Sequence, residues 1–326
     1  MSDTTLVTGG SGYIGAPLVA ELRAAGHVVR VLDSLVHGQH EVAAEQERAG
    51  VEVLRADVRD REARREALAG VRRVVHLAAI VGDAACARDT TLSDEVNVGA
   101  TRELLAEAGA AGVERLVFAS TCSNYGRMAD PSVPITEEGE LRPVSLYAEQ
   151  KVAMEQLMLG GASGTTSPTC LRFATVYGVA SRMRFDLTVN EFTRDLWAGR
   201  RLEVFGEQFW RPYIHVRDAA RAVLAVLQAP IDRVGGEVFN AGNTAENYRK
   251  LDLVGEITRQ IDRGSIVYTH RDEDPRDYKV GFEKIHERLG FEPLLTVPDG
   301  ISEIIAALDS GTFGDPYDAR YRNTLD

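Results

Sequence analysis

Residues 5–27 read TLVTGGSGYIGAPLVAELRAAGH: a short apolar run, a glycine-rich turn, and a stretch with apolar residues at helical spacing. The glycines satisfy Gly-x-x-Gly-x-x-Gly from Gly9 and Gly-x-Gly-x-x-Gly from Gly10. Such a turn leaves no room for side chains where a diphosphate approaches, and the following helix offers N–H donors and a positive dipole. The stretch therefore predicts a strand, turn and helix that bind a dinucleotide. The expected contacts in the turn are Gly9, Gly12, Tyr13, Ile14 and Gly15.

Short apolar runs alternate with amphipathic stretches through the first half of the chain. The apolar runs are 4–9, 27–33, 51–58, 72–79 and 114–120, and two later runs are 169–178 and 236–242. The stretches 15–26, 62–70 and 97–112 between them have helical spacing. This alternation predicts an α/β fold, a Rossmann-type doubly wound parallel sheet.

The pattern loosens from about residue 178, where basic and aromatic residues concentrate. We expect a Rossmann domain over 1–177, with contributions from about 214–262. A smaller, interleaved C-terminal substrate domain is expected over 178–326. A length of 326 residues is consistent with two domains, or with one large domain that carries an elaboration.

Composition excludes several classes of protein. A hydrophobic fraction of 44% with 26% charged residues is ordinary for a globular chain. The net charge of −12 argues against nucleic acid as a partner. No apolar run approaches the ~18 residues of a membrane span, and the N-terminus does not resemble a secretory signal. Three scattered cysteines form neither a disulfide framework nor a zinc pattern, and the histidines are equally scattered. These features predict a cytoplasmic protein without a metal or a membrane partner.

Asp33 closes the second apolar run, eighteen residues beyond Gly15. A carboxylate there accepts hydrogen bonds from both ribose hydroxyls of the adenosine half and repels a 2′-phosphate, so NAD is favoured over NADP. The alternative for Asp33 is a loop cap. Asp57 and Val58 end the third run, where they would contact adenine; the alternative for Asp57 is an ordinary carboxylate of a loop between strand and helix.

Tyr147 and Lys151 stand four residues apart, which places both on one helix face. A lysine ammonium and the positive nicotinamide of NAD both stabilise a phenolate. Bringing a phenol from a pKa of ~10 to near neutrality requires about 3 units, or roughly 4 kcal/mol. A Tyr and a Lys at this spacing often occur by chance, but this pair follows the glycine turn and a run that ends in Ser-Thr-Cys-Ser (120–123), which favours a functional pair.

An ordered set of motifs spans nearly the whole chain. It comprises TGGSGYIG (8–15), Asp33, HLAA (76–79), Asn97, STCSNYG (120–126), Tyr147 with Lys151, LRFATVYG (171–178), RPYIHVRD (211–218), FNAG (239–242) and DPRDYKV (274–280). The set resembles the extended short-chain dehydrogenase/reductases, specifically the NAD-dependent nucleotide-sugar epimerase/dehydratase family of the UDP-glucose 4-epimerase type. The resemblance implies NAD as cofactor, a nucleoside diphosphate sugar as partner, and a homodimer formed through helices at about 97–111 and 147–160.

The resemblance also implies roles for individual residues. Tyr147 matches the catalytic base, Lys151 the residue that orients the ribose and tunes that base, and Thr121 the residue that bonds the sugar hydroxyl. Leu77, Ala78 and Ala79 match cofactor contacts. Asn190, Arg211 and Arg276 match residues that hold the substrate diphosphate, where paired N–H groups of arginine suit phosphate. Arg182 and Arg184 are expected to meet a carboxylate on the sugar, with solvated surface charges as the alternative.

The chain departs from the family where related enzymes carry carboxylates. The 4,6-dehydratases have an Asp-Glu pair after the Thr, and the glucuronate decarboxylases have a Glu two residues before the motif tyrosine; this chain has Cys122 and Ser123 there. Cys122 is either an acid or base in an unusual elimination, or a small packed residue.

Three functions stay open on these residues. The leading hypothesis is an epimerase that oxidises sugar carbon 4 transiently and retains its NAD. The second is a nucleotide-4-ketosugar reductase, or a dehydratase that uses Cys122. The third is a non-enzymatic dinucleotide-sensing module, although such proteins usually lack the Tyr or the Lys.

Overall fold

A seven-stranded parallel sheet forms the centre of the molecule. The computed structural model describes residues 4–128, 130, 132–162, 164–270 and 276–323. The sheet has the order β10-β6-β5-β4-β1-β2-β3. Its strands are β1 (Thr4–Thr8), β2 (Val28–Asp33), β3 (Glu52–Arg55), β4 (Val71–His76), β5 (Arg115–Thr121), β6 (Ser167–Phe173) and β10 (Glu237–Ala241). From β1 the chain first builds toward β3 and then returns to add β4 on the other side, so the order reverses between β1 and β4. The predicted Rossmann-type sheet is confirmed, and ligands bind at such a reversal.

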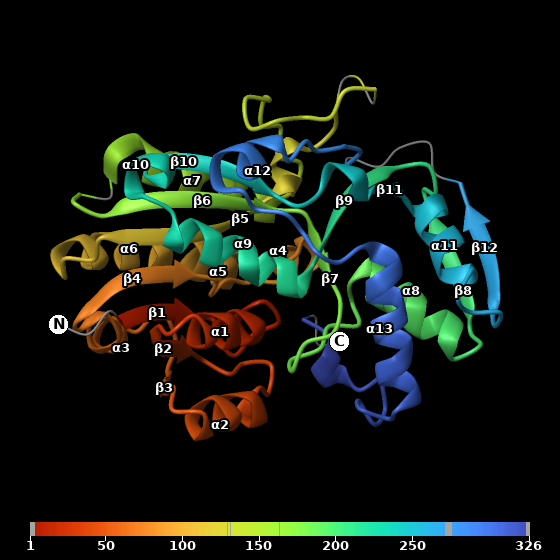
Figure 1. The fold of residues 1–326 in the computed structure, drawn as a ribbon, viewed down its shortest axis with the longest axis horizontal. Helices are drawn as coiled ribbons and strands as arrows, with labels where there is room; N and C mark the ends of the chain where they lie inside the picture. Colours follow the sequence, from red (N-terminus) through yellow and green to blue (C-terminus); the bar gives the residue numbers. More distant parts are fainter. Residues whose placement is uncertain (1–3, 129, 131, 163, 271–275, 324–326) are drawn as a thin grey trace.

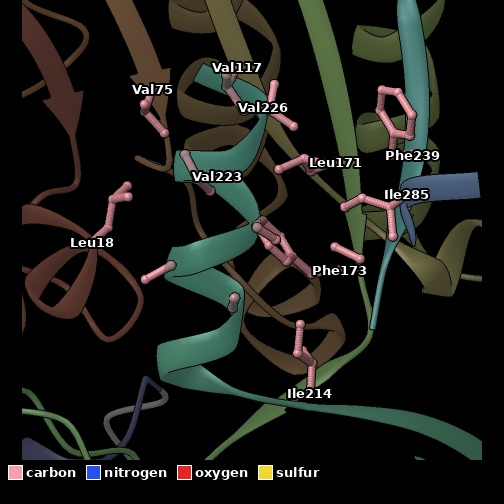
Figure 2. Close-up of a cluster of buried hydrophobic side chains, with 14 of the residues drawn as sticks. Leu18, Val75, Val117, Leu171, Phe173, Ile214, Val223, Val226, Phe239 and Ile285 are labelled. Carbon is pink, nitrogen blue, oxygen red and sulfur yellow. The ribbon is translucent and has the colours of Figure 1, made fainter. Parts of the chain in front are cut away.

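Helices cover both faces of this sheet, and alternate residues of each strand supply the two cores (Figure 1). On one face, α1 (Gly15–Ala24) and α9 (Val216–Gln228) pack against Val7, Val75 and Val117. Figure 2 shows Val223 and Val226 of α9 among the side chains of this cluster. On the other face lie α3 (Arg61–Leu68), α6 (Thr101–Ala110) and α7 (Leu146–Leu157).

The run 169–178 is not a single strand, which corrects the sequence expectation. β6 ends at Phe173, and β7 (Thr175–Tyr177) pairs instead with β9 (Trp210–His215), which pairs in turn with β11 (Asn247–Arg249). Both halves of the run are buried, Phe173 at 6% and Tyr177 at 0% exposure, so hydrophobicity gives no sign of the break. β7 carries the chain out of the central sheet at its carboxyl edge.

A smaller part lies beyond that edge (Figure 1). Its helices are α8 (Thr188–Trp197), α11 (Lys250–Thr258) and α13 (Val297–Asp309), which share one apolar core with the parallel strands β8 (Arg201–Phe205) and β12 (Ser265–Thr269). In the tail after α13, Phe313 is only 7% exposed and packs edge-on against Phe185. Residues 324–326 of that tail lie outside the described residues.

The chain passes between the two parts more than once. α9, β10 and α12 (Glu283–Leu289) belong to the main core, whereas β11 and α11 lie with the smaller part. The division at about residue 177 remains a proposal. The other helices are α2 (His40–Arg48), α4 (Asp83–Arg88), α5 (Thr90–Asp94) and α10 (Ile231–Val234), with short 3-10 or π turns at Glu95–Ala100, Cys122–Tyr125, Met158–Ala162, Thr244–Glu246 and Ala319–Tyr321. No helix within the described part of the chain has the length and apolarity to cross a membrane.

Candidate active site

A cleft of about 770 Å³ opens at the carboxyl ends of the central strands, where the smaller part meets the sheet. Its lining comes from the glycine turn, the ends of β2 to β5, the start of α7 and the segment after β7. Most of the predicted site residues line it together. They are Gly9, Gly12, Tyr13, Ile14, Gly15, Asp33, Asp57, Val58, Leu77, Ala78, Ala79, Thr121, Tyr147, Lys151, Arg182, Arg184 and Arg276. Cys122, Asn190 and Arg211 are not among the lining residues.

The glycine turn is closed so tightly that side chains are excluded. A Cβ on Gly15 would lie 2.2 Å from the carbonyl oxygen of Gly9. Gly9 itself has φ +71°, and a Cβ there would lie 2.9 Å from the backbone nitrogen of Ala78. The turn therefore presents bare backbone at the amino end of α1, as the diphosphate of a dinucleotide requires. The residues present fit NAD on this ground.

Asp33 is 6% exposed and stands at the end of β2. Its carboxylate accepts hydrogen bonds from the backbone nitrogens of Ser11 and Leu35, both at 2.9 Å. Burial raises the pKa of this carboxyl, and the two hydrogen bonds oppose the rise. Asp33 thus ties the glycine turn to the loop after β2 and lines the cleft as well. The predicted contact with the ribose requires that Asp33 line the cleft, and it does.

The loop after β3 also lines the cleft. Asp57 forms an ion pair of 2.9 Å with Arg59, and this hydrogen bond lowers the pKa of Asp57. Val58 is buried beside it. After β4, the backbone nitrogen of Ala78 donates to Thr8 Oγ1 at 3.3 Å, which holds this part of the chain against β1. These loops line the cleft where adenine contacts were predicted.

Tyr147 and Lys151 share the cleft-facing side of α7. Ser145 caps this helix, since its Oγ accepts from the backbone nitrogen of Ala148 at 3.3 Å. Lys151 Nζ donates to the carbonyl of Ala119 at 2.7 Å and lies 5.8 Å from the centroid of the Tyr147 ring. Burial lowers the pKa of Lys151 to about 8 and raises that of Tyr147. Ionisation of the phenol would therefore require a further positive charge, which the oxidised nicotinamide of a bound NAD would supply.

Thr121 ends β5, and its Oγ1 accepts from the backbone nitrogen of Ser123 at 3.1 Å. Ser123 and Tyr278 also line the cleft, and their hydroxyl oxygens lie 3.2 Å apart. From the sequence, Ser123 was expected only to stand in the place of a carboxylate, and Tyr278 was not predicted as a site residue. In the sequence, only the position of Tyr278 inside the motif 274–280 could have indicated that it belongs to the site. Residues 274 and 275 of that motif lie outside the described residues.

The structure argues against the predicted catalytic role of Cys122. Its thiol is 1% exposed, lies in the main hydrophobic core, and donates to the carbonyl of Arg172 at 3.2 Å. Burial raises its pKa well above the ordinary value, so the thiolate is disfavoured. Thr121 and Ser123 line the cleft, whereas the residue between them faces the core. Cys122 is therefore the small packed residue of the second interpretation.

The predicted phosphate contact of Asn190 is also corrected. Its side chain is fully buried, and both its oxygen and its nitrogen form hydrogen bonds within the protein. Its Oδ1 accepts from the backbone nitrogen of Gly178 at 3.0 Å. Its Nδ2 donates to the hydroxyl of Tyr13 and to the carbonyl of Arg184, at 3.0 and 2.8 Å. Asn190 joins the glycine turn to the segment after β7 instead of facing a substrate phosphate.

The two predicted diphosphate arginines occupy different positions. Arg276 lines the cleft and forms an ion pair of 2.9 Å with Asp83. Arg211 is 7% exposed, donates to the carbonyl of Trp210 at 2.7 Å, and lies 5.4 Å from the ring centroid of Tyr278. Arg211 therefore contacts a residue that lines the cleft, Tyr278, whereas Arg276 lines the cleft itself.

His76 is a core residue, and both nitrogens of its ring have hydrogen-bond partners. Nδ1 lies 2.7 Å from the hydroxyl of Thr8, and Nε2 lies 2.8 Å from that of Thr101. Burial lowers its pKa to about 3, so the ring is neutral. Across the described ranges, no three His, Cys, Asp or Glu side chains gather as metal ligands.

Comparison with known proteins agrees with this geometry. The model of the NAD dependent epimerase/dehydratase family matches residues 5–242. The UDP-glucose 4-epimerase of Streptomyces lividans is 30% identical, over 90% of this chain and 92% of its own. The dTDP-glucose 4,6-dehydratase of Streptomyces griseus is 31% identical, over 94% of each chain. The solved Thermus thermophilus UDP-glucose 4-epimerase with NAD has a TM-score of 0.82 and 27% identity, over 94% of this chain and 99% of its own. The chain is thus an enzyme of the NAD-dependent epimerase/dehydratase family.

Proposed function

We propose that the protein is a nucleotide-sugar epimerase that acts at sugar carbon 4 and retains its NAD. The observation that carries the proposal is that Tyr147, Lys151 and Thr121 line the same cleft as the glycine turn. The epimerases among the relatives support it. A retained cofactor suffices because the reaction consumes no reductant.

Tyr147, Thr121 and Lys151 have separate roles in this reaction. The Tyr147 phenolate takes the proton from the sugar hydroxyl, and Thr121 hydrogen-bonds that oxygen. Lys151 keeps a positive charge beside the phenol, which favours the ionised form. Bound NAD supplies reversible hydride acceptance at the same sugar carbon. The 4-keto sugar turns over in the cleft, and Tyr147 returns the proton when the carbon is reduced on its other face.

In this proposal the substrate is bound by the segment before α12 and by the turn after β5. Arg276 holds the diphosphate of a nucleoside diphosphate sugar, and the hydroxyls of Ser123 and Tyr278 position the sugar. Elimination through Cys122 loses its support, since the thiol does not line the cleft. We also propose that the enzyme is a cytoplasmic homodimer that pairs through 97–111 and 147–160, which sedimentation equilibrium tests.

The decisive experiment incubates the purified enzyme with UDP-glucose, UDP-galactose, UDP-glucuronic acid and dTDP-glucose, each without added cofactor. Chromatography and proton NMR of the products should show one pair of epimers approaching equilibrium. A stoichiometric requirement for NADH would make the protein a 4-ketosugar reductase. Loss of one water by mass spectrometry would make it a dehydratase. Absence of turnover with every substrate, in wild type and in the Tyr147→Phe variant alike, would leave a binding module.

A further inference from the structure

Three buried polar atoms of cleft-lining residues lack hydrogen-bond partners among the described residues. They are Nδ1 of His37, Nε of Arg182 and Oδ1 of Asn323. All three residues line the cleft, and each comes from a different segment: the loop after β2, the segment after β7, and the C-terminal tail. Three such atoms in one cleft indicate a ligand that would complete their hydrogen bonds.

These groups gather at the Asp33 end of the cleft. His37 follows Asp33 by four residues. The positive charge of Arg182 acts on both Asp33 and His37, and Arg182 interacts electrostatically with Tyr13 of the glycine turn. The neighbourhood of Asp33 and the glycine turn is where the adenosine ribose and the diphosphate of a dinucleotide lie in this fold.

The segment after β7 is joined to the C-terminal tail, and we call residues 182–186 with 321–323 the clasp. Arg182 Nη2 donates to the carbonyl of Arg322 at 3.1 Å, and the backbone nitrogen of Phe185 donates to the carbonyl of Tyr321 at 2.8 Å. The backbone nitrogen of Asn323 donates to Asp186 Oδ2 at 3.0 Å.

The clasp is firmly supported on its far side. The rings of Phe185, Phe313 and Tyr321 pack edge-on with centroids 5.1 to 5.7 Å apart. Arg184 is held by Asp186 at 2.8 Å. Arg182 is only 6% exposed, and leaving a charged N–H donor buried without an acceptor is costly. The aromatic contacts and the Arg184–Asp186 ion pair hold the clasp in place. A ligand in the cleft would supply the acceptor that Arg182 Nε lacks among the described residues.

We infer that the clasp closes over the adenosine half of NAD, with Arg182 as its principal contact, and so retains the cofactor. A cationic donor, an amide acceptor and an imidazole nitrogen match the chemistry of a ribose diol beside a diphosphate. Arg182 is then a cofactor residue instead of the sugar-carboxylate residue that the sequence suggested. The inference rests on NAD binding and not on the proposed epimerase activity.

The test counts bound NAD in the purified full-length protein. Wild type, Arg182→Met and the control Arg201→Met are denatured after buffer exchange, and released NAD is measured by chromatography. Arg201 is an exposed arginine of β8, so its loss controls for charge and length. Exchange against isotopically labelled NAD, followed by mass spectrometry, gives the release rate. Arg182→Met should release NAD at least about tenfold faster than wild type, and Arg201→Met should match wild type.

Two further variants protect the test against misfolding. Asn323→Ala and His37→Ala each remove one of the other cleft-lining groups, and each should accelerate NAD release by a few-fold. If Arg182→Met fails to fold, unchanged NAD release in both of these variants overturns the inference. It is also overturned if Arg182→Met folds and releases NAD as slowly as wild type does, and a loss of substrate affinity in that variant would return Arg182 to the sugar. None of these readouts depends on turnover, so a failure of the proposed epimerase activity is scored separately.

Discussion

The hydroxyl oxygens of Ser123 and Tyr278 lie 3.2 Å apart in the cleft, although 155 residues separate them in the chain. Ser123 follows β5 in the main part, and Tyr278 lies in the segment that precedes α12. Ser123 stands at a position where the resemblance implies a carboxylate in dehydratases and decarboxylases. In the proposed epimerase, the neutral hydroxyls of Ser123 and Tyr278 position the sugar without offering a strong acid or base.

Removing either hydroxyl of this pair should weaken catalysis moderately. Ser123→Ala and Tyr278→Phe should each lower kcat/KM by about 3- to 10-fold, the worth of one hydrogen bond. The double variant should fall short of the product of the two effects, because both changes break the same contact. Tyr268→Phe, at an exposed tyrosine of β12, is the matched control. Fully multiplicative losses would show that the pair does not act as a unit.

Replacing Tyr147 by Phe should abolish most turnover while leaving the cofactor in place. A positioned general base contributes about 10²- to 10⁴-fold, and kcat should fall by that factor. NAD content per protomer should stay within error of wild type, since the glycine turn is untouched. A large loss of NAD in this variant would assign Tyr147 to cofactor binding instead.

Arg276→Ala and Arg211→Ala should separate a direct contact from a supporting one. If both arginines hold the substrate diphosphate, as the sequence implies, each variant weakens apparent substrate affinity by about 10- to 150-fold. The geometry predicts the larger effect for Arg276, because Arg211 acts through the Tyr278 ring. NAD content should remain intact in both. Equal loss of NAD and substrate binding would mean that the arginines support the fold.

Turnover should decline above about pH 8. Burial lowers the pKa of Lys151 to about 8, so its ammonium is lost above that pH together with its influence on Tyr147. The wild-type rate profile should show this alkaline limb, and Lys151→Arg should move it upward, since arginine stays charged. An alkaline limb that is identical in both proteins would assign the titration to another group.

His76 should make the fold sensitive to mild acid. Its folded pKa is about 3, below its ordinary value of 6.5, so the unfolded chain binds a proton that the folded chain does not. Its contribution to stability is therefore complete above pH 6.5 and is lost as the pH falls toward 3, at up to about 1.4 kcal/mol per pH unit.

Urea unfolding of wild type and His76→Asn at pH 7 and pH 5 tests this. The variant should be less stable at pH 7, and its free energy of unfolding should fall less between the two pH values. His286→Asn, at an exposed histidine of α12, should show the wild-type slope. Equal slopes in all three proteins would mean that His76 is not responsible.

Features encoded within a few neighbouring residues could be predicted from the sequence. The glycine turn, Asp33 and the four-residue spacing of Tyr147 and Lys151 are local patterns, and each lines the cleft. Alternating apolar runs likewise predicted a parallel sheet, because strands buried on both faces must be apolar throughout. Local backbone sterics and the helical period are enough to produce these features.

Only the tertiary structure decided which way individual side chains face and which distant segments meet. Cys122 lies between two cleft-lining residues and yet faces the core, and Asn190 serves Tyr13 and Gly178 instead of a ligand. The contact of Ser123 with Tyr278 and that of Arg182 with the tail join segments more than a hundred residues apart. Such contacts depend on how the two parts pack against each other, and packing leaves no periodic trace in the sequence.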